Sequence, residues 1–127
     1  STGLEYFSPD WLAKNLIGNE RPQDLQATLR ELTATGIATA INEELPKARA
    51  VYLCGGGARN SALKQAIDVL IPNAKVASTM ELGIDPGWVE ACAFAWLARQ
   101  RLEEKPGNLP SVTGANRATV LGALHLP

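Results

Sequence analysis

The chain has 127 residues, of which 46% are hydrophobic, which fits one domain that would bury a core if its sheet is complete. Its formal net charge of −1, with acidic and basic residues interspersed, leaves no basic excess for nucleic-acid phosphates, so we expect no nucleic-acid partner. No apolar stretch approaches the roughly 20 residues of a membrane span, and two cysteines without metal-ligand spacing predict reduced thiols in a cytoplasmic protein.

Two helices are predicted in the first third of the chain. Ser8 followed by proline is typical of a helix start and predicts a short helix to about Leu16, followed by a turn over 18–20. From Pro22, apolar residues recur at spacings of three to five, which predicts a long amphipathic helix ending before Pro46. We expect Gly36, inside this helix, to mark a close packing contact.

The middle of the chain predicts a β-α-β unit. The apolar run Ala50–Cys54 has the length and composition of a buried parallel strand. A helix is expected from about Asn60 until Pro72 stops it, and Ala74–Ser78 is a second short strand.

A glycine-rich turn connects the first strand to the helix. Gly55, Gly56, Gly57 and Ala58 allow positive φ and close approach of a ligand to the backbone, and Asn60 is a good N-cap. The unpaired N–H groups of a helix start favour a phosphate or another electron-rich group. The spacing matches neither the dinucleotide fingerprint nor a phosphate loop ending in Lys-Ser/Thr, so a tight connection that binds no ligand is the alternative interpretation.

A second candidate site follows the second strand. Asp85 and Pro86 predict the cap and first position of a helix that continues towards Arg101. The helix is alanine-rich and apolar, so we expect it to be largely buried. Glu90, in its first turns, is either a glutamate that complements the helix dipole or one engaged by a ligand or partner.

The last segment is rich in turn-forming residues. Residues 105–116 have no helical or strand periodicity and predict a loop, whose hydroxyls, such as that of Thr113, either line a cleft or face solvent. Arg117 either contacts phosphate or is solvated, and a short strand is expected near Val120. The lone histidine, His125, has no adjacent nucleophile, so we expect no catalytic role for it.

Three motifs occur in one order along the chain: Cys54–Asn60, Gly83–Ala91 and Gly107–Ala115. Together they resemble the C-terminal part of the anhydro-N-acetylmuramic acid kinase family. Ser1–Gly3 and the pair Trp11-Leu12 also fit, so the resemblance covers the whole chain but only about the last third of the family's length. The start at serine agrees with a piece of a longer protein.

The resemblance implies an α/β fold. The family belongs to the sugar kinase, Hsp70 and actin superfamily, whose two ribonuclease-H-like domains close around ATP and a second substrate. Residues 1–127 would be a single C-terminal subdomain fragment of such a two-domain kinase, with a short, mostly parallel sheet flanked by helices. The implied reaction uses Mg-ATP and water to open the 1,6-anhydro ring of anhydro-N-acetylmuramic acid and phosphorylate O6, in cell-wall recycling. ATP and Mg²⁺ are thus the expected cofactors.

The resemblance also assigns site residues. Gly55, Gly56, Gly57 and Ala58 would approach the nucleoside and its nearest phosphate, with Asn60 capping the helix beneath.

Glu90 matches an acidic position that would hydrogen-bond the amino sugar across the interdomain cleft.

No catalytic residue and no metal ligand is assigned to this chain. The family's phosphate loop and its base aspartate lie in the preceding N-terminal region, which is the expected partner. A base is needed because water is a poor nucleophile at neutral pH. The chain's own aspartates lie on predicted helices or caps and are poor substitutes, so we expect the chain alone to be inactive. These are Asp10, Asp24, Asp68 and Asp85.

An incomplete sheet leaves an open edge and an exposed apolar helix face, which predicts self-association into a homo-oligomer. Two other interpretations stay open. One is a non-enzymatic nucleotide-binding or interaction module with the same fold. The other is a flavodoxin-like domain that uses the turn at Gly55 to bind an anion.

Overall fold

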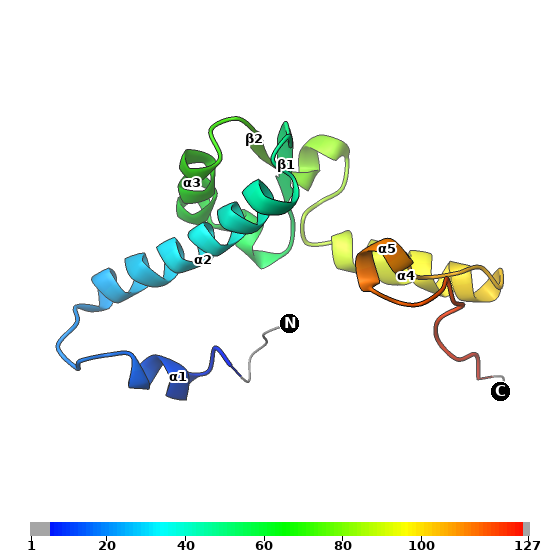
Figure 1. Ribbon diagram of the computed structural model, residues 1–127, viewed down its shortest axis with the longest axis horizontal. Helices are drawn as coiled ribbons and strands as arrows, with labels where there is room; N and C mark the ends of the chain where they lie inside the picture. The colour runs from blue at the N-terminus through cyan, green and yellow to red at the C-terminus, as the bar shows by residue number, and fades with distance from the viewer. Residues whose placement is uncertain (1–5, 126–127) are drawn as a thin grey trace.

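The computed structural model describes residues 6–125 and shows an elongated α/β arrangement (Figure 1). The motif residues Ser1–Gly3 lie outside the described residues. Two helices and two strands form the centre of the molecule, a short helix lies near the middle of the long one, and the last helices extend at the far end. Within residues 6–125, each helix is too short or too polar to span a lipid bilayer.

The first two helices follow the predicted start signals. Helix α1 spans Pro9–Lys14, and the Ser8 hydroxyl accepts a hydrogen bond from the Trp11 N–H at 3.1 Å. Helix α2 spans Pro22–Glu44, with proline at its first position. Both predictions are confirmed.

The turn between α1 and α2 is held by one carboxylate. Glu20 accepts hydrogen bonds from the N–H groups of Ile17 at 2.6 Å and Gly18 at 3.0 Å. Gly18 has φ of +91°, which glycine adopts without steric cost. The bond from Ile17, together with the other backbone donors, lowers the pKa of Glu20. The predicted turn over 18–20 is confirmed.

The β-α-β unit is confirmed. Strands β1 (Ala50–Leu53) and β2 (Lys75–Ser78) pair in parallel, with Ala50 opposite Lys75 and Leu53 opposite Ser78. Helix α3 (Ser61–Leu70) connects them. A 3-10 turn, η2 (Thr79–Leu82), follows β2 and is tied back to it by an ion pair between Lys75 and Glu81.

The core lies where α2 and α3 cover the sheet. Its buried residues come from α2, from α3 and the residue after it, and from β2: Ala34, Ala38, Ile67, Ile71 and Val76. The small side chains on α2 let it approach α3 closely. Gly36 takes no part in this contact, because a Cβ added there would meet no atom of the described residues within 4 Å. The prediction of a close packing contact at Gly36 is wrong.

Helix α4 begins later than predicted and spans Val89–Leu102. The Asp85 carboxylate accepts the Gly87 N–H at 2.7 Å, and the Asp85 carbonyl accepts the Trp88 N–H at 2.9 Å. Asp-Pro-Gly-Trp therefore forms a turn, for which aspartate and proline at the first two positions are typical. The predicted cap at Asp85 is wrong because turn residues and helix-start residues overlap.

The expected burial of α4 is also wrong. None of its residues is buried, and Phe94 and Trp96 are 65% and 51% exposed. The C-terminal segment approaches the second half of the helix, where a Cβ added at Gly107 would lie 3.2 Å from Leu97 Cδ2 and 3.4 Å from Leu121 Cβ. An apolar composition predicts burial only if another element covers the helix, and the described residues supply little cover.

The C-terminal segment differs from the predicted loop and strand. A one-turn helix, α5 (Pro110–Thr113), lies within the expected loop, and residues 118–125 contain no strand. The Asn108 side chain donates to the Arg117 carbonyl at 3.0 Å and accepts the Thr119 N–H at 2.7 Å. Residues 117–119 are thus held by a side-chain amide and not by backbone pairing with another strand. The prediction of a strand near Val120 is wrong.

Candidate functional site

The glycine-rich turn leaves the carboxyl end of β1, where open α/β sheets bind ligands. Gly55 has φ of +72° and ψ of −166°, a region that is essentially restricted to glycine. The chain then enters a 3-10 turn, η1 (Gly56–Arg59). A Cβ added at Gly55 or Gly56 would meet no atom of the described residues within 4 Å, whereas one at Gly57 would lie 3.7 Å from Leu63 Cδ2. The surface over the first two glycines is therefore open.

Several amides of this turn already have partners. The Ala58 N–H donates to the Gly55 carbonyl at 3.2 Å, and the Asn60 N–H donates to the Gly57 carbonyl at 3.0 Å. These bonds keep the turn compact. A ligand over Gly55 and Gly56 therefore meets a preformed backbone surface, and the amides of Ala58 and Asn60 are not its donors.

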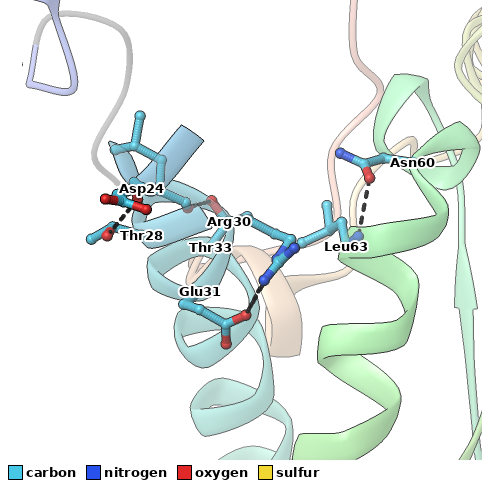
Figure 2. A network of polar contacts seen from close by, with 8 residues as sticks. Asp24, Thr28, Arg30, Glu31, Thr33, Asn60 and Leu63 are labelled. Carbon is cyan, nitrogen blue, oxygen red and sulfur yellow. Dashed lines mark hydrogen bonds and ion pairs between the residues drawn. The ribbon is translucent and has the colours of Figure 1, made fainter. Parts of the chain in front are cut away.

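Asn60 is the N-cap of α3, as predicted. Its Oδ1 accepts the Leu63 N–H at 3.0 Å (Figure 2). The amide nitrogen of the same side chain is left pointing away from that bond. Asn60 thus holds the start of the helix and presents a hydrogen-bond donor at the exposed surface.

The structure brings the two predicted sites together. The Gly55 N–H donates to the Pro86 carbonyl at 2.7 Å, which joins the glycine-rich turn to the turn that precedes α4. The Arg59 side chain lies over this junction, because a Cβ added at Gly87 would be 3.3 Å from Arg59 Nη2. Neither Arg59 nor Gly87 was predicted as a site residue. The sequence did contain a signal for their proximity, because each turn follows the carboxyl end of a predicted parallel strand.

Glu90 lies in the first turn of α4 and is exposed. Its carboxylate forms no hydrogen bond or ion pair with another described residue. Glu90 follows Pro86 closely in the sequence, so the length of the chain keeps the two Cα atoms within about 14 Å. The Gly55–Pro86 bond therefore holds Glu90 in the neighbourhood of the glycine-rich turn.

The other chemically reactive side chains do not gather around this junction. Within residues 6–125, no three histidine, cysteine, aspartate or glutamate side chains group as metal ligands. Cys54 and Cys92 are free and exposed. The Thr113 hydroxyl donates to the Leu109 carbonyl at 3.1 Å, which is a contact within its own turn.

An open groove with mixed polar and apolar lining, which the sequence did not predict, lies beside Asn60. It has a volume of about 580 Å³ and runs between the N-terminal half of α2 and the start of α3. From α2 it is lined by Gln23, Gln26 and Arg30, which recur at helical spacing on one face. That spacing of polar side chains was the available signal, but it is equally typical of a solvated helix face.

Comparison with known proteins finds relatives along the whole chain. The sequence profile described as anhydro-N-acetylmuramic acid kinase matches residues 1–127. Curated proteins with this name are 52% identical over 126 residues in Coxiella burnetii (strain RSA 493 / Nine Mile phase I), 50% over 125 in Nitrosomonas europaea and 48% over 128 in Thiobacillus denitrificans. Each alignment covers 98% of this chain and 34% of the relative, so the chain spans about a third of the length of these relatives.

Proposed function

The chain belongs to the anhydro-N-acetylmuramic acid kinase family, and from this premise we propose that it is the C-terminal, nucleotide- and sugar-facing portion of such a kinase. The whole enzyme would use ATP and water to open the 1,6-anhydro ring of anhydro-N-acetylmuramic acid and form N-acetylmuramic acid 6-phosphate. The two-stranded parallel sheet with its covering helices would be part of a ribonuclease-H-like domain. Cell-wall recycling in the cytoplasm is the process that this reaction would serve.

The observation that carries the proposal is the junction of the glycine-rich turn with the start of α4. Gly55 has a conformation that favours glycine, and the surface over it and Gly56 is open. Because no side chain covers the backbone here, a nucleoside could lie flat and close to the backbone atoms of this surface. ATP supplies the phosphoryl group when bound, and the backbone of residues 55–58 would position its adenosine side.

Glu90 is the proposed contact to the amino sugar. Its exposed carboxylate, without a partner among the described residues, is an acceptor for a sugar hydroxyl or for the N–H of an acetamido group. The bond between Gly55 and Pro86 would keep the start of α4, and with it Glu90, near the nucleotide. Glu90 would therefore orient the sugar without taking part in proton transfer.

Proton transfer and metal binding are proposed to come from the rest of the enzyme. Two of the described aspartates have structural partners: Asp24 pairs with Arg21 at 2.7 Å, and Asp85 accepts the Gly87 N–H. The described residues also lack a cluster of acidic ligands that fits Mg²⁺, so no step is assigned to the metal here. We therefore propose that the chain is inactive without the N-terminal domain.

The test is detection by mass spectrometry of N-acetylmuramic acid 6-phosphate from the full-length kinase, incubated with Mg-ATP and the anhydro sugar. Gly56→Val and Glu90→Ala should each abolish or strongly reduce the product. A Cβ added at Gly56 meets no described atom within 4 Å, so the loss in Gly56→Val would come from a blocked ligand surface rather than from misfolding.

Glu43→Ala, which removes an exposed carboxylate at the far end of α2, is the matched control and should keep full activity. The proposal is wrong if the folded wild-type enzyme forms no product. That result would favour the alternative interpretation, a nucleotide-binding or interaction module with the same fold. Product formed by the 127-residue chain alone would contradict the assignment of the base to the N-terminal domain.

A further inference from the structure

Helix α4 has few attachments to the central unit of the molecule, which consists of α2, α3 and the two strands (residues 22–78). Figure 1 shows α4 extending away from that unit, beyond the turn that precedes it. Within the part of the chain that the structure describes, the only hydrogen bond from this unit to residues 85–102 runs from the Gly55 N–H to the Pro86 carbonyl. One hydrogen bond holds two segments together but leaves them free to rotate about it. A second contact is needed to fix the direction in which α4, and with it Glu90, leaves the unit.

The Arg59 side chain supplies a second contact. Arg59 is the last residue of η1, and the N–H groups of the residues on either side of it donate to carbonyls within the same turn. From this fixed base the guanidinium reaches Gly87, the residue after Pro86, where an added Cβ would lie 3.3 Å from Nη2. Arg59 therefore contacts the turn before α4 one residue beyond the backbone hydrogen bond.

Gly87 leaves the space that Arg59 occupies. A Cβ added there would lie 3.2 Å from Asp85 Oδ1 and 3.3 Å from Arg59 Nη2, both closer than an ordinary van der Waals contact. Gly87 does not have positive φ, so the backbone conformation itself does not require glycine. The lack of a side chain at this position instead lets the guanidinium approach the turn.

Opposite charges border this space. Asp85 Oδ1 accepts the Gly87 N–H at 2.7 Å and lies on the same side of the glycine as the Arg59 guanidinium. The cation and the carboxylate attract each other across the place of the missing side chain. Because Asp85 also shapes the turn before α4, this attraction draws that turn towards the glycine-rich turn.

We propose that Arg59 is a positioning residue, which holds the start of α4 against the glycine-rich turn through Gly87 and Asp85 and thereby fixes the place of Glu90. Its effect on the sugar rests on the proposed function, because that effect assumes that Glu90 contacts the amino sugar. Arg59 binds neither the sugar nor the nucleotide. It acts on the sugar only through Glu90, three residues after Gly87.

The first experiment measures the kinetics of the full-length kinase with each substrate varied in turn. Arg59→Ala should raise KM for the anhydro sugar about tenfold and leave KM for ATP within about twofold of the wild-type value. Arg59→Lys keeps the charge, so its KM for the sugar should lie closer to wild type than that of Arg59→Ala. Arg49→Ala removes an exposed arginine at the other end of β1 and is the matched control, with both constants unchanged.

Two kinetic results would overturn the proposal. One is an active Arg59→Ala enzyme whose KM for the sugar equals that of the wild type. The other is a rise in KM for ATP without a rise in KM for the sugar, which would make Arg59 a contact to the nucleotide.

The second experiment asks whether Arg59 acts through Glu90. Titration calorimetry of the full-length protein, carried to sugar concentrations that saturate the Glu90→Ala variant, gives Kd for the wild type, the two alanine variants and the double variant. Once Glu90→Ala has removed the positioned group, Arg59→Ala should weaken sugar binding by less than about a further twofold. Losses that add in full would overturn the positioning role, since they would show that Arg59 acts independently of Glu90.

The third experiment does not depend on catalysis. Amide hydrogen exchange of the full-length protein, read by mass spectrometry, should be about tenfold faster at the start of α4 in Arg59→Ala than in the wild type. This region includes the Cys92 N–H, which donates to the Trp88 carbonyl at 2.9 Å. Exchange in α3 should not change.

The exchange measurement separates this proposal from the proposed function. Faster exchange in Arg59→Ala, in a protein whose wild type has no kinase activity, would support the Arg59 contact and contradict the kinase. Unchanged exchange in an active kinase would overturn the Arg59 contact alone. Unchanged exchange in a protein without kinase activity would overturn both.

Discussion

At the scale of the residue, Gly55 has a conformational role that its two glycine neighbours lack. Its φ of +72° with ψ of −166° is strained for any residue with a Cβ, whereas Gly56 and Gly57 do not have positive φ. The sequence alone does not distinguish the roles of these three consecutive glycines. In the structure Gly55 shapes the turn, whereas Gly56 has an ordinary φ and lies under an open surface.

We therefore predict opposite effects of alanine at the two positions. Gly55→Ala should lower the free energy of unfolding by about 1–3 kcal/mol because of backbone strain. Gly56→Ala adds a Cβ that meets no described atom within 4 Å, so it should leave stability unchanged or raise it by up to about 1 kcal/mol. Urea unfolding followed by circular dichroism measures both values. Equal losses in the two variants would contradict the assigned roles.

Glu20 gives the molecule a pH-dependent contact. Hydrogen bonds from the Ile17 N–H and other backbone groups lower the pKa of its carboxyl in the folded state. Near that pKa the unfolded chain binds more protons than the folded one, so stability rises with pH. The contribution is present above the pKa of glutamate in the unfolded chain and is lost as pH falls through the lower folded value.

Glu20→Gln should therefore flatten the pH dependence of the unfolding midpoint below about pH 4.3, the ordinary pKa of glutamate. The measurement is urea unfolding in steps between neutral and acidic pH. Glu43→Gln removes an exposed carboxylate for which no described hydrogen bond or ion pair exists and serves as the control. If the unfolding midpoint of Glu20→Gln depended on pH as steeply as that of the wild type, the turn would not depend on the ionised carboxylate.

At the scale of the element, α3 is the helix on which the central unit depends. It is capped by Asn60, it connects the two strands, and it carries Ile67, which is completely buried in the core that α2 and α3 share. Leu63, Ala66 and Ile67 face this core, at the helical spacing that the sequence pattern indicated. Helix α4 is also rich in apolar residues, but residues 6–125 supply no covering element along most of its length, so composition alone led to a wrong prediction of burial.

Ile67→Ala should lower the free energy of unfolding by about 2–5 kcal/mol, since it opens a cavity in a small core. Val69→Ala on the same helix removes a side chain that is 72% exposed and should change stability by less than about 0.5 kcal/mol. Chemical unfolding of the two variants side by side provides the comparison. Similar losses in the free energy of unfolding for both variants would mean that the core of the central unit does not include Ile67.

At the scale of the whole molecule, the two-stranded sheet and α4 leave apolar surface without cover in the described part of the chain. Phe94 and Trp96, two residues apart on α4, are both more than half exposed. Exposed aromatic side chains on one helix are typical of an interface. The proposed occupants are the N-terminal domain and a second copy of the chain.

We predict that the 127-residue chain self-associates through α4. Replacing Phe94 and Trp96 together with serine should shift the molecule towards monomer, with a change in stability below about 1 kcal/mol because neither side chain is buried. Sedimentation velocity over a range of concentrations measures the shift. A wild-type chain that is a stable monomer at high concentration would contradict the prediction.

Most of the elements were predictable because their signals are local. Ser8 and Asn60 act as caps where the sequence placed them, and Pro22 begins α2. The strands predicted at 50–54 and 74–78 pair in parallel over 50–53 and 75–78. The family resemblance was likewise carried by short motifs, and the profile match over the whole chain confirms it. The assigned roles of the glycines and of Glu90 remain predictions.

Where the predictions failed, a local signal had two meanings or a distant contact decided the outcome. Asp-Pro-Gly begins either a turn or a helix, and the hydrogen bond from the Gly87 N–H to Asp85 selects the turn. The Asn108 side chain, rather than a strand, holds the end of the chain.

The sequence by itself determined the family, the starts of α1, α2 and α3, and the parallel β-α-β unit, because each depends on residues close together in the chain. The tertiary structure alone decided that Gly55 bonds to Pro86, that the described residues leave α4 uncovered along most of its length, and that α2 and α3 border an open groove. The bond and the groove join residues that lie far apart in the sequence, and the exposure of α4 depends on which elements reach it. Such features depend on how the elements pack, and no local pattern of side chains specifies them.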